Sequence, residues 1–327
     1  MARSEQPVVG VDIGGTKIIT AVFDMDGVML SRIHCLTLGS EGPASVINRL
    51  KAAIDQVIEK AGLERDRVGG IGVAAAGAID INRGLVADSP NLPRWHNIPL
   101  RDKLADSLGT AVFLLNDANA AALAEHRLGA GRGLDNLIYI TVSTGIGGGM
   151  IINGELYNGT DGTAAEIGHM IIKIGGPLCK CGKRGCLEAM ASGTAIARLA
   201  QKRLRRGEES IMAGLADNKV GDVTAEVVAA AARKGDELAL AVIEESAGYL
   251  GIGLANLVNL MNPQMIIIGG GVSKMGDLLM RPARKSMKAN AFDLPARAVR
   301  LVRPKLGVDA ELTGAAIYAR QCLGARV

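Results

Sequence analysis

A glycine turn between two apolar strands, near the start of the chain, constrains the fold most. The segment Val9–Ile19 reads VGVDIGGTKII. Glycine lets backbone N–H groups approach phosphate oxygens, a hydroxyl adds a donor, and a carboxylate can hold Mg²⁺. The alternative is an ordinary tight turn between strands. The pattern favours a phosphate-binding hairpin whose polar and glycine positions are Asp12, Gly14, Gly15, Thr16 and Lys17.

The same plan returns over residues 136–154. A β-rich run leads into the turn STGIGGG at 143–149, and an apolar strand follows. Gly27 closes the first hairpin as Gly154 closes the second. Two similar hairpins far apart suggest two related domains facing each other across a cleft, each offering a loop to a nucleotide's phosphates. Neither turn fits the P-loop or the Rossmann fingerprint, because both lead into strands and neither has the required spacing.

Length and composition agree with two globular domains. The chain has 327 residues, 48% of them apolar, 21% charged and only 2% aromatic, so its core must be aliphatic. The formal charge of +4 is spread along the chain. The single basic run, 202–206, is more simply a solvated helix face than a nucleic-acid site. No apolar run resembles a signal peptide or a membrane span, so we expect a soluble cytoplasmic protein.

The order of elements predicts a mixed α/β sheet protein. Three strands are expected at 8–11, 18–23 and 28–36, a helix at 44–61, and strands at 70–75 and 111–115 on either side of a loop. A helix at 118–128 precedes the second hairpin. Beyond Ser192 the chain is mostly helical, with a strand at 265–268 and a last helix at 310–322. We place an N-terminal domain at 1–117, completed by 310–327, and a C-terminal domain at 118–309.

Asn116 and Asp117 end a strand and precede a helix. Their side chains should therefore project at the carboxyl end of the strand, where α/β proteins build their sites. One carboxylate there could accept the proton of a hydroxyl that attacks a phosphoryl group, and Asp117 suits that role. The alternative is that Asp117 only caps the helix.

Three of the five cysteines lie within eight residues, at Cys179, Cys181 and Cys186. Glycines between them let the loop fold back, and His169 is the nearest candidate for a fourth ligand. Four protein ligands fill a tetrahedron and leave no position for water, so the pattern predicts a structural zinc ion rather than a catalytic one. The alternative is a set of buried cysteines without metal.

Two glutamates flank this predicted zinc site. Glu166 precedes His169 by three residues, and Glu188 follows Cys186 by two. Zinc binding would draw both carboxylates together, and carboxylates accept hydrogen bonds from vicinal hydroxyls. We therefore interpret the pair as part of a polyol or sugar pocket, although each could be an ordinary surface residue.

Taken together, these motifs resemble the ROK family of sugar kinases, within the actin-like, hexokinase-like (ribonuclease H-like) ATPase fold group. The resemblance covers essentially the whole chain and rests on four segments, 12–17, 116–121, 145–169 and 179–188. The cysteine motif is highly specific, whereas the first segment is shared by the wider fold group. One departure is Ala76, where many relatives carry a proline before Gly77, which puts the shape of that loop in doubt.

The resemblance implies roles for individual residues. Asp117 would be the catalytic base, and His169 would direct one ring nitrogen to zinc and the other to a sugar hydroxyl. The sugar site it implies consists of Gly77, Asn91, Asn116, Asp117, Glu166, His169 and Glu188. The nucleotide site it implies consists of Asp12, Gly14, Gly15, Thr16, Lys17, Thr144 and Gly145 at the phosphates and Gly269, Gly270 and Gly271 at the adenosine.

Residues 89–95, SPNLPRW, resemble the glucose-phosphorylating members of the family most closely. The implied activity is ATP- and Mg²⁺-dependent phosphorylation of a hexose, with glucose at its 6-hydroxyl as first choice, in a homodimeric enzyme of carbohydrate metabolism and glycolysis. Closure of the two domains would exclude water.

Several alternatives stay open. They are an N-acetylmannosamine kinase, another hexose kinase of the family, or polyphosphate as donor. A sugar-sensing repressor would need a DNA-binding domain ahead of Asp12, and only eleven residues stand there. A zinc hydrolase would need an open metal position.

Overall fold

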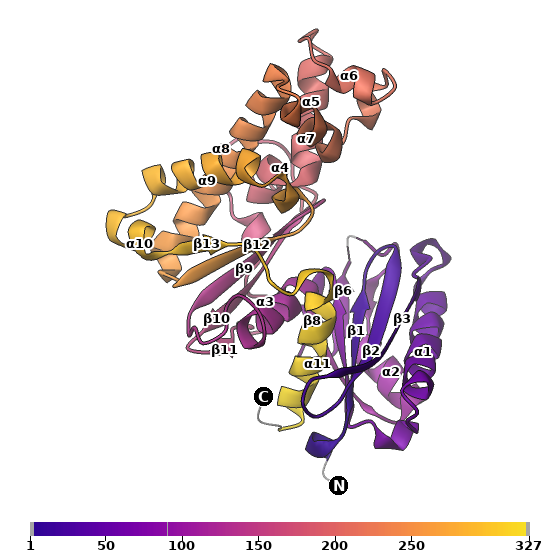
Figure 1. Ribbon diagram of the computed structural model, residues 1–327. Coiled ribbons are helices and arrows are strands. Elements are labelled where there is room, and N and C mark those ends of the chain that lie inside the picture. The colour runs from indigo at the N-terminus through magenta and orange to yellow at the C-terminus, as the bar shows by residue number, and fades with distance from the viewer. Residues whose placement is uncertain (1–2, 90, 325–327) are drawn as a thin grey trace. The chain divides into compact units, whose positions relative to one another are not determined.

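The computed structural model describes residues 3–89 and 91–324 and separates into two compact units (Figure 1). The first unit comprises Met1–Asp135, Gly149–Ala165 and Lys305–Val327, and the second comprises Asn136–Gly148 and Glu166–Pro304. The chain therefore passes between the units four times. Residues 118–135 and 149–165 group with the first unit by their contacts, whereas the prediction from sequence places them in the second domain. The boundaries of the folding domains stay a prediction.

The first unit is built on a five-stranded sheet of order β3-β2-β1-β4-β8. Strands β1, β4 and β8 run parallel, while β2 forms antiparallel pairs with β1 on one side and with β3 on the other. The register pairs Asp12 with Ala74 and Ala75 with Asn116, so the carboxyl ends of the three parallel strands meet at one edge. The strands are β1 (Val8–Ile13), β2 (Lys17–Phe23), β3 (Met29–Leu36), β4 (Gly70–Ala75) and β8 (Ala111–Asn116).

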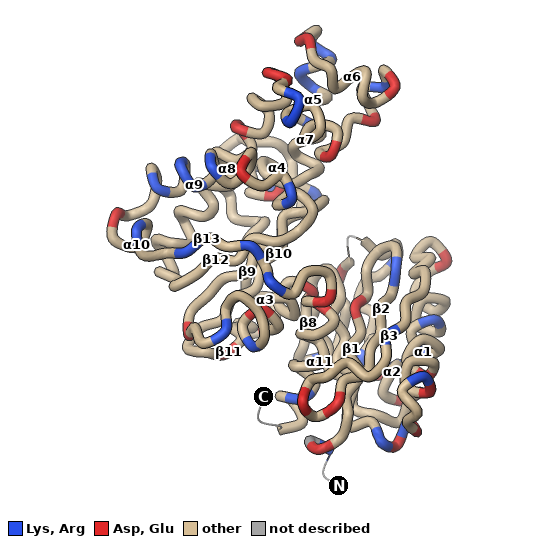
Figure 2. The backbone as a smooth tube through the Cα atoms, viewed as in Figure 1, with Lys and Arg blue, Asp and Glu red and all other residues tan. Residues whose placement is uncertain are grey.

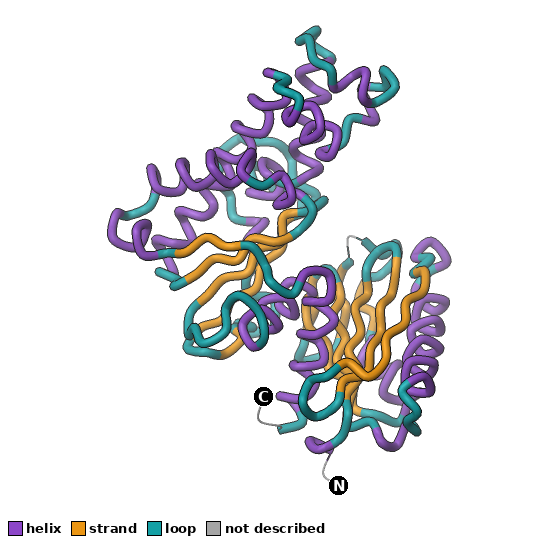
Figure 3. Tube along the Cα trace, in the orientation of Figure 1, coloured by secondary structure: helices purple, strands orange, loops and turns teal. Residues whose placement is uncertain are grey.

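Helices cover both faces of this sheet (Figure 3). On one face, α1 packs its apolar side against an aliphatic core. The residues on that side recur at helical spacing and are Val46, Leu50, Ile54 and Val57. On the other face, α11 approaches the strands at two glycines. A Cβ atom at Gly72 would lie 1.8 Å from the Ala315 carbonyl oxygen, so only glycine permits this packing. The helices are α1 (Pro43–Lys60), α2 (Leu100–Leu108), α3 (Asp117–Arg127) and α11 (Ala310–Cys322).

Residues 76–110, which we expected to be a loop, contain regular structure. A small antiparallel sheet lies there, with α2 after it. Its three strands are too short to show a period in the sequence. They are β5 (Ala78–Asp80), β6 (Leu85–Asp88) and β7 (His96–Ile98).

A second five-stranded sheet has the order β11-β10-β9-β12-β13, in which β9, β12 and β13 run parallel. Its strands are β9 (Leu137–Val142), β10 (Ile146–Ile152), β11 (Glu155–Leu156), β12 (Met265–Gly269) and β13 (Arg300–Val302). The helices that follow in the second unit are α4 (Leu187–Ala191), α5 (Gly193–Leu204), α6 (Met212–Leu215), α7 (Ala225–Arg233), α8 (Glu237–Met261), α9 (Asp277–Asn290) and α10 (Asp293–Ala298).

Among the described residues, α8 is the one helix that is long and apolar enough, by length and composition alone, to cross a membrane. It has 25 residues, and its most apolar window has a mean hydropathy of 1.4. However, 61% of that window is buried, and α8 packs against α7 and α9. Burial on several sides is what makes a core helix apolar nearly all round, so we interpret α8 as the central helix of its unit.

Charged residues are spread over both units (Figure 2). The basic run 202–206 lies at the end of α5, where Lys202, Arg205 and Arg206 are exposed and Arg203 forms an ion pair with Glu208. This is the solvated helix end expected from the sequence.

Candidate active site

The shape of the first glycine turn is fixed by a backbone hydrogen bond within the turn and by the Thr37 side chain. Gly14 N–H donates to the Lys17 carbonyl at 3.0 Å, and the Thr37 hydroxyl donates to the Gly14 carbonyl at 2.7 Å. Gly15, Thr16 and Lys17 are exposed at the tip. A Cβ atom at Gly15 would lie 3.1 Å from the Asn91 carbonyl oxygen, so the turn and the Asn91 loop are in contact. The hairpin therefore presents backbone groups to solvent, as phosphate binding requires.

Asn116 and Gly77 lie together at the carboxyl edge of the first sheet. The Asn116 side chain is the N-cap of α3, accepting from the amides of Ala118 and Asn119, and its Nδ2 donates to the Gly77 carbonyl at 3.0 Å. Gly77 has φ +109°, a conformation that side chains disfavour. Asn116 is therefore the N-cap, and Asp117 is the first residue of the helix, where its carboxylate also accepts from the Ala118 amide at 2.8 Å.

Four carboxyl groups of the first unit influence one another. Burial, then the charge of Asp117, raises the pKa of Asp12 to about 7, although Lys17 opposes this. Burial also raises the pKa of Asp117, against hydrogen bonds that lower it. Burial and the charges of Asp12, Asp117 and Asp309 raise the pKa of Glu311 to about 7. A hard divalent cation prefers such a set of oxygen donors, so Asp12 and its neighbours fit Mg²⁺.

The second glycine turn, in the second unit, is joined to Glu188. The Ser143 amide donates to the Gly145 carbonyl at 2.8 Å, and this hydrogen bond closes a tight turn around Thr144. The Ile146 amide donates to Glu188 Oε2 at 2.9 Å. A Cβ atom at Gly145 would lie 2.4 Å from that oxygen, so Gly145 must be glycine for Glu188 to fit. Glu188 thus fixes this turn as well as facing the cysteine loop.

The glycines after β12 lie beside this turn, because β12 pairs with β9 and places Gly269 opposite Thr141. Gly270 has φ +84°, and a Cβ atom there would lie 2.4 Å from the Val142 carbonyl oxygen. One at Gly271 would lie 3.7 Å from the Ser143 hydroxyl. The two predicted nucleotide-binding segments of the second unit are therefore neighbours.

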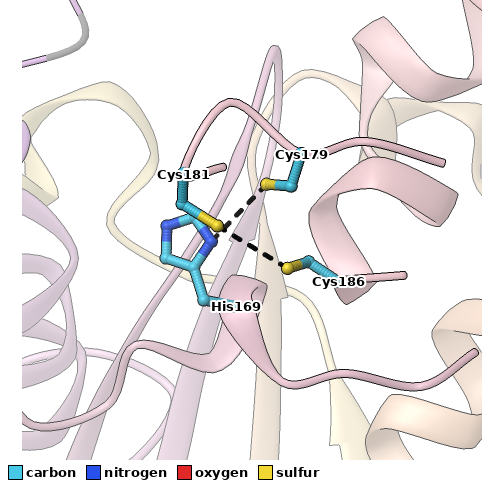
Figure 4. A group of neighbouring side chains, drawn as sticks. All are labelled: His169, Cys179, Cys181 and Cys186. Carbon is cyan, nitrogen blue, oxygen red and sulfur yellow. Dashed lines mark hydrogen bonds between the residues drawn. The ribbon is translucent and has the colours of Figure 1, made fainter. Parts of the chain in front are cut away.

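His169, Cys179, Cys181 and Cys186 point toward one another (Figure 4), and their ligand atoms all lie within 4.8 Å. The His169 Nδ1 atom is 3.7 Å from Cys179 Sγ, and the sulfurs of Cys181 and Cys186 are 3.7 Å apart. Burial raises the pKa of Cys179 to about 12 and also raises that of Cys186. Zinc binds thiolates, so a bound ion would reverse both shifts. Three sulfurs and one imidazole nitrogen fit a tetrahedral zinc site.

The two glutamates beside this cluster face it from two directions. His169 Nε2 is 3.8 Å from Glu166 Oε2, so the ring presents one nitrogen to the thiols and the other to Glu166. Glu188 Oε1 lies 3.7 Å from Cys179 Sγ. The structure thus gathers Glu166, His169 and Glu188 around the cysteine loop, with Glu166 and His169 positioned by the 3₁₀ turn Ile167–His169.

Two acidic residues near Asp12 were missed from the sequence. Asp309 and Glu311 stand at the start of α11, some 300 positions after Asp12. Only the packing of α11 on β1 and β4 brings them to the strand ends, and no local pattern reports that packing. The one local signal for these two residues is their position at the start of α11, a helix that contains Gly314.

The fold and these sites define a class, the two-domain α/β proteins of the actin-like, hexokinase-like fold. A model of the ROK family matches residues 8–322. The chain belongs to the ROK family.

Relatives of known name place the chain more closely. A glucokinase of Thermotoga maritima is 38% identical over 317 residues, 97% of this chain and 98% of that protein. The crystal structure of a ROK family glucokinase from Streptomyces griseus with glucose and AMPPNP has a TM-score of 0.81 and 40% identity, covering 96% of this chain and 99% of that one. A xylose repressor of Caldicellulosiruptor bescii is 32% identical, covering 87% of this chain and 71% of that protein.

Proposed function

We propose that this chain transfers a phosphoryl group from ATP to the 6-hydroxyl of glucose. The observation that carries the proposal is Asp117, at the start of α3 and beside Asp12 at the carboxyl edge of the first sheet. A site that joins a half-buried carboxylate to an exposed glycine turn has both a proton acceptor and phosphate donors. The similarity to glucokinases supports glucose as the hexose.

Each residue has a chemical task in this reaction. Asp117 accepts the proton of the attacking hydroxyl, and burial raises its pKa toward the range useful for a general base. Amides of the turns at Gly14–Thr16 and Thr144–Gly145 stabilise charge on the phosphates. Hydrogen bonds hold the sugar hydroxyls in this proposal. The carboxylates of Glu166 and Glu188 accept from them, and His169, Asn91 and Asn116 complete the set. Asp12 would hold Mg²⁺, which when bound offsets phosphate charge.

The cysteine cluster is proposed as a structural zinc site with four protein ligands, His169, Cys179, Cys181 and Cys186. His169 would bind the ion through Nδ1, which would fix the ring tautomer and leave Nε2 available on the other side. A homodimer is proposed from the family resemblance alone, and a cytoplasmic location from the composition of the chain and its clustered cysteines.

The test is a coupled assay with ATP, Mg²⁺ and glucose, followed by ³¹P NMR of the product. We expect glucose-dependent ADP formation and a phosphate ester at the 6-position. Sugar binding without turnover would contradict a kinase and favour a sugar-sensing regulator, the activity named for the xylose repressor relative. Turnover with polyphosphate but not ATP would correct the donor alone.

A further inference from the structure

Glu125 is a carboxylate without any exposure to solvent, in the last turns of α3. Its two oxygens accept hydrogen bonds from three backbone N–H groups, those of Ala130, Lys305 and Leu306, at 2.7–3.1 Å. A Cβ atom at Gly129 would lie 2.1 Å from Oε2, so the following turn must carry glycine to admit the carboxylate. Burying a charge is costly unless it is hydrogen-bonded in this way, so the arrangement has a strong structural reason.

Two of the three donors belong to the segment with which the chain re-enters the first unit. That unit resumes at Lys305, and the chain continues through the 3₁₀ turn Gly307–Asp309 into α11. Glu125 therefore ties α3 to the lead-in of α11, although 180 positions separate Glu125 from Lys305.

The two helices joined by Glu125 each carry one acidic residue of the candidate active site in the first turn. Asp117 begins α3, and Glu311 lies in the first turn of α11. The helices touch backbone to backbone, because a Cβ atom at Gly314 would lie 1.8 Å from the Ala120 carbonyl oxygen. Eight residues of helix, about 12 Å, separate Asp117 from Glu125, so a shift at one end is transmitted along a stiff element.

We propose that Glu125 is a positioning residue for phosphoryl transfer. By holding the start of α11 against α3, it keeps Asp117 in register with Asp12 and Glu311. The inference rests on the proposed function but concerns a residue remote from both substrates. A misplacement of about 1 Å at a reacting group is enough to lower turnover by up to about 100-fold.

The alternative is that Glu125 only stabilises the fold, and a matched residue separates the two ideas. Asp236 in the second unit is also a carboxylate that accepts from backbone amides of a helix and of a preceding loop, those of Ala239 and Ile211. It also accepts from the Ser210 hydroxyl. Asp236 is half-buried and caps α8, so Asp236→Asn weakens a carboxylate–amide clamp that joins no element of the candidate active site.

The experiment compares Glu125→Gln, Asp236→Asn and the unchanged chain. Glutamine keeps the shape but turns an NH₂ group toward N–H donors. The melting temperatures of the three proteins are measured first. The values of kcat and KM are then measured at a temperature below all three melting temperatures. Glucose affinity is followed by the fluorescence of Trp95, the single tryptophan. Glu125→Asp, which keeps the charge, replaces Glu125→Gln if that variant does not fold.

We expect Glu125→Gln to lower kcat by about 10- to 100-fold with glucose affinity unchanged, while Asp236→Asn loses stability but keeps its kcat. The proposal is overturned if Glu125→Gln, or the aspartate variant in its place, keeps the kcat of the unchanged chain. It is equally overturned if Glu125→Gln and Asp236→Asn both lower kcat in proportion to their loss of melting temperature. Absence of glucose turnover in the unchanged chain would instead refute the proposed function.

Discussion

At the scale of single residues, Asp117 is the group on which the proposed phosphoryl transfer depends. Its side chain is half-buried at a helix start, and Asn116 rather than Asp117 is the N-cap of that helix. Asp117→Asn keeps the shape but removes the proton acceptor, so we predict that kcat falls at least about 100-fold with sugar binding largely intact. Steady-state kinetics and Trp95 fluorescence measure the two effects. Near-normal turnover in the folded variant would exclude Asp117 as the base.

Glu311 and Asp12 make the stability of the cation-free protein depend on pH. Both have pKa values raised to about 7 by burial first and by neighbouring carboxylates. Between their ordinary pKa values and about 7, the folded state binds more protons than the unfolded state. Stability is therefore highest at the acidic end of this range and is lost as pH rises through it.

Glu311→Gln removes one of these two contributions. We predict that the loss of unfolding free energy between pH 5 and pH 8, measured by urea unfolding without divalent cations, is smaller in this variant by about 1–3 kcal/mol. Asp309 is half-buried and pairs with Arg32, so Asp309→Asn is a matched control in the same turn with a weaker effect. Equal pH dependence in the unchanged chain and Glu311→Gln would contradict the buried-carboxyl argument.

At the scale of elements, the cysteine loop is a segment whose order should depend on metal. Residues 179–186 have little apolar material of their own to bury, and their three sulfurs already converge with the imidazole of His169. We predict one zinc ion per chain and a clear fall in melting temperature for Cys181→Ser, since structural zinc can contribute on the order of 10 kcal/mol in small domains. Cys35→Ser, outside the cluster, should keep its zinc. Freshly purified protein without stoichiometric metal would refute the site.

Ala165 is an element boundary held in an unfavourable conformation. It has φ +66°, in the left-handed region, and it is the last residue of the first unit before Glu166 begins the second. We predict that Ala165→Gly stabilises the fold by about 0.5 kcal/mol, because relief of about 1–2 kcal/mol of strain exceeds the entropy cost of glycine. Ala289→Gly, on the exposed side of α9, should destabilise it by about 1 kcal/mol. Chemical unfolding of both variants compares them, and destabilisation by both would remove the strain argument.

Local patterns predicted the long elements and failed where contacts between distant segments decide. Helices expected at 44–61 and 118–128 are α1 (Pro43–Lys60) and α3 (Asp117–Arg127), because apolar spacing and caps are local signals. The convergence of the cysteines and His169 was likewise readable from spacing. By contrast, Glu125 and Glu311 gain their surroundings from the segment that returns after residue 304, and no window of sequence contains both partners.

At the scale of the whole molecule, the two sheets repeat one plan. Each begins with a hairpin around a glycine turn and continues with two further strands parallel to the first, in the orders β3-β2-β1-β4-β8 and β11-β10-β9-β12-β13. The repeated sequence motif thus corresponds to a repeated topology. Each unit contains one glycine turn of the kind proposed above to bind phosphate.

The choice of sugar is considered at the scale of the whole molecule, because the residues proposed to bind it are distributed along the chain. Glu166, His169 and Glu188 are hydrogen-bonding groups grouped in the second unit. A site built for particular hydroxyls discriminates against sugars that invert or lack one, since its polar groups are then left unpaired. A 2-acetamido group would need added space and an amide partner, and Asn91 already lies against the Gly15 turn.

We therefore predict that glucose has the highest kcat/KM in a panel with mannose, N-acetylglucosamine and N-acetylmannosamine. The inverted or enlarged 2-substituent should cost between about 10-fold and 10⁴-fold, depending on whether it only crowds the site or leaves a buried polar group unpaired. The four values are measured with one enzyme preparation and saturating ATP, and Asp117→Asn serves as the background for each sugar. A preference for N-acetylmannosamine would overturn the assignment of glucose while leaving Asp117 as the base. Equal values for all four sugars would show that Glu166, His169 and Glu188 do not select the sugar by its hydroxyls.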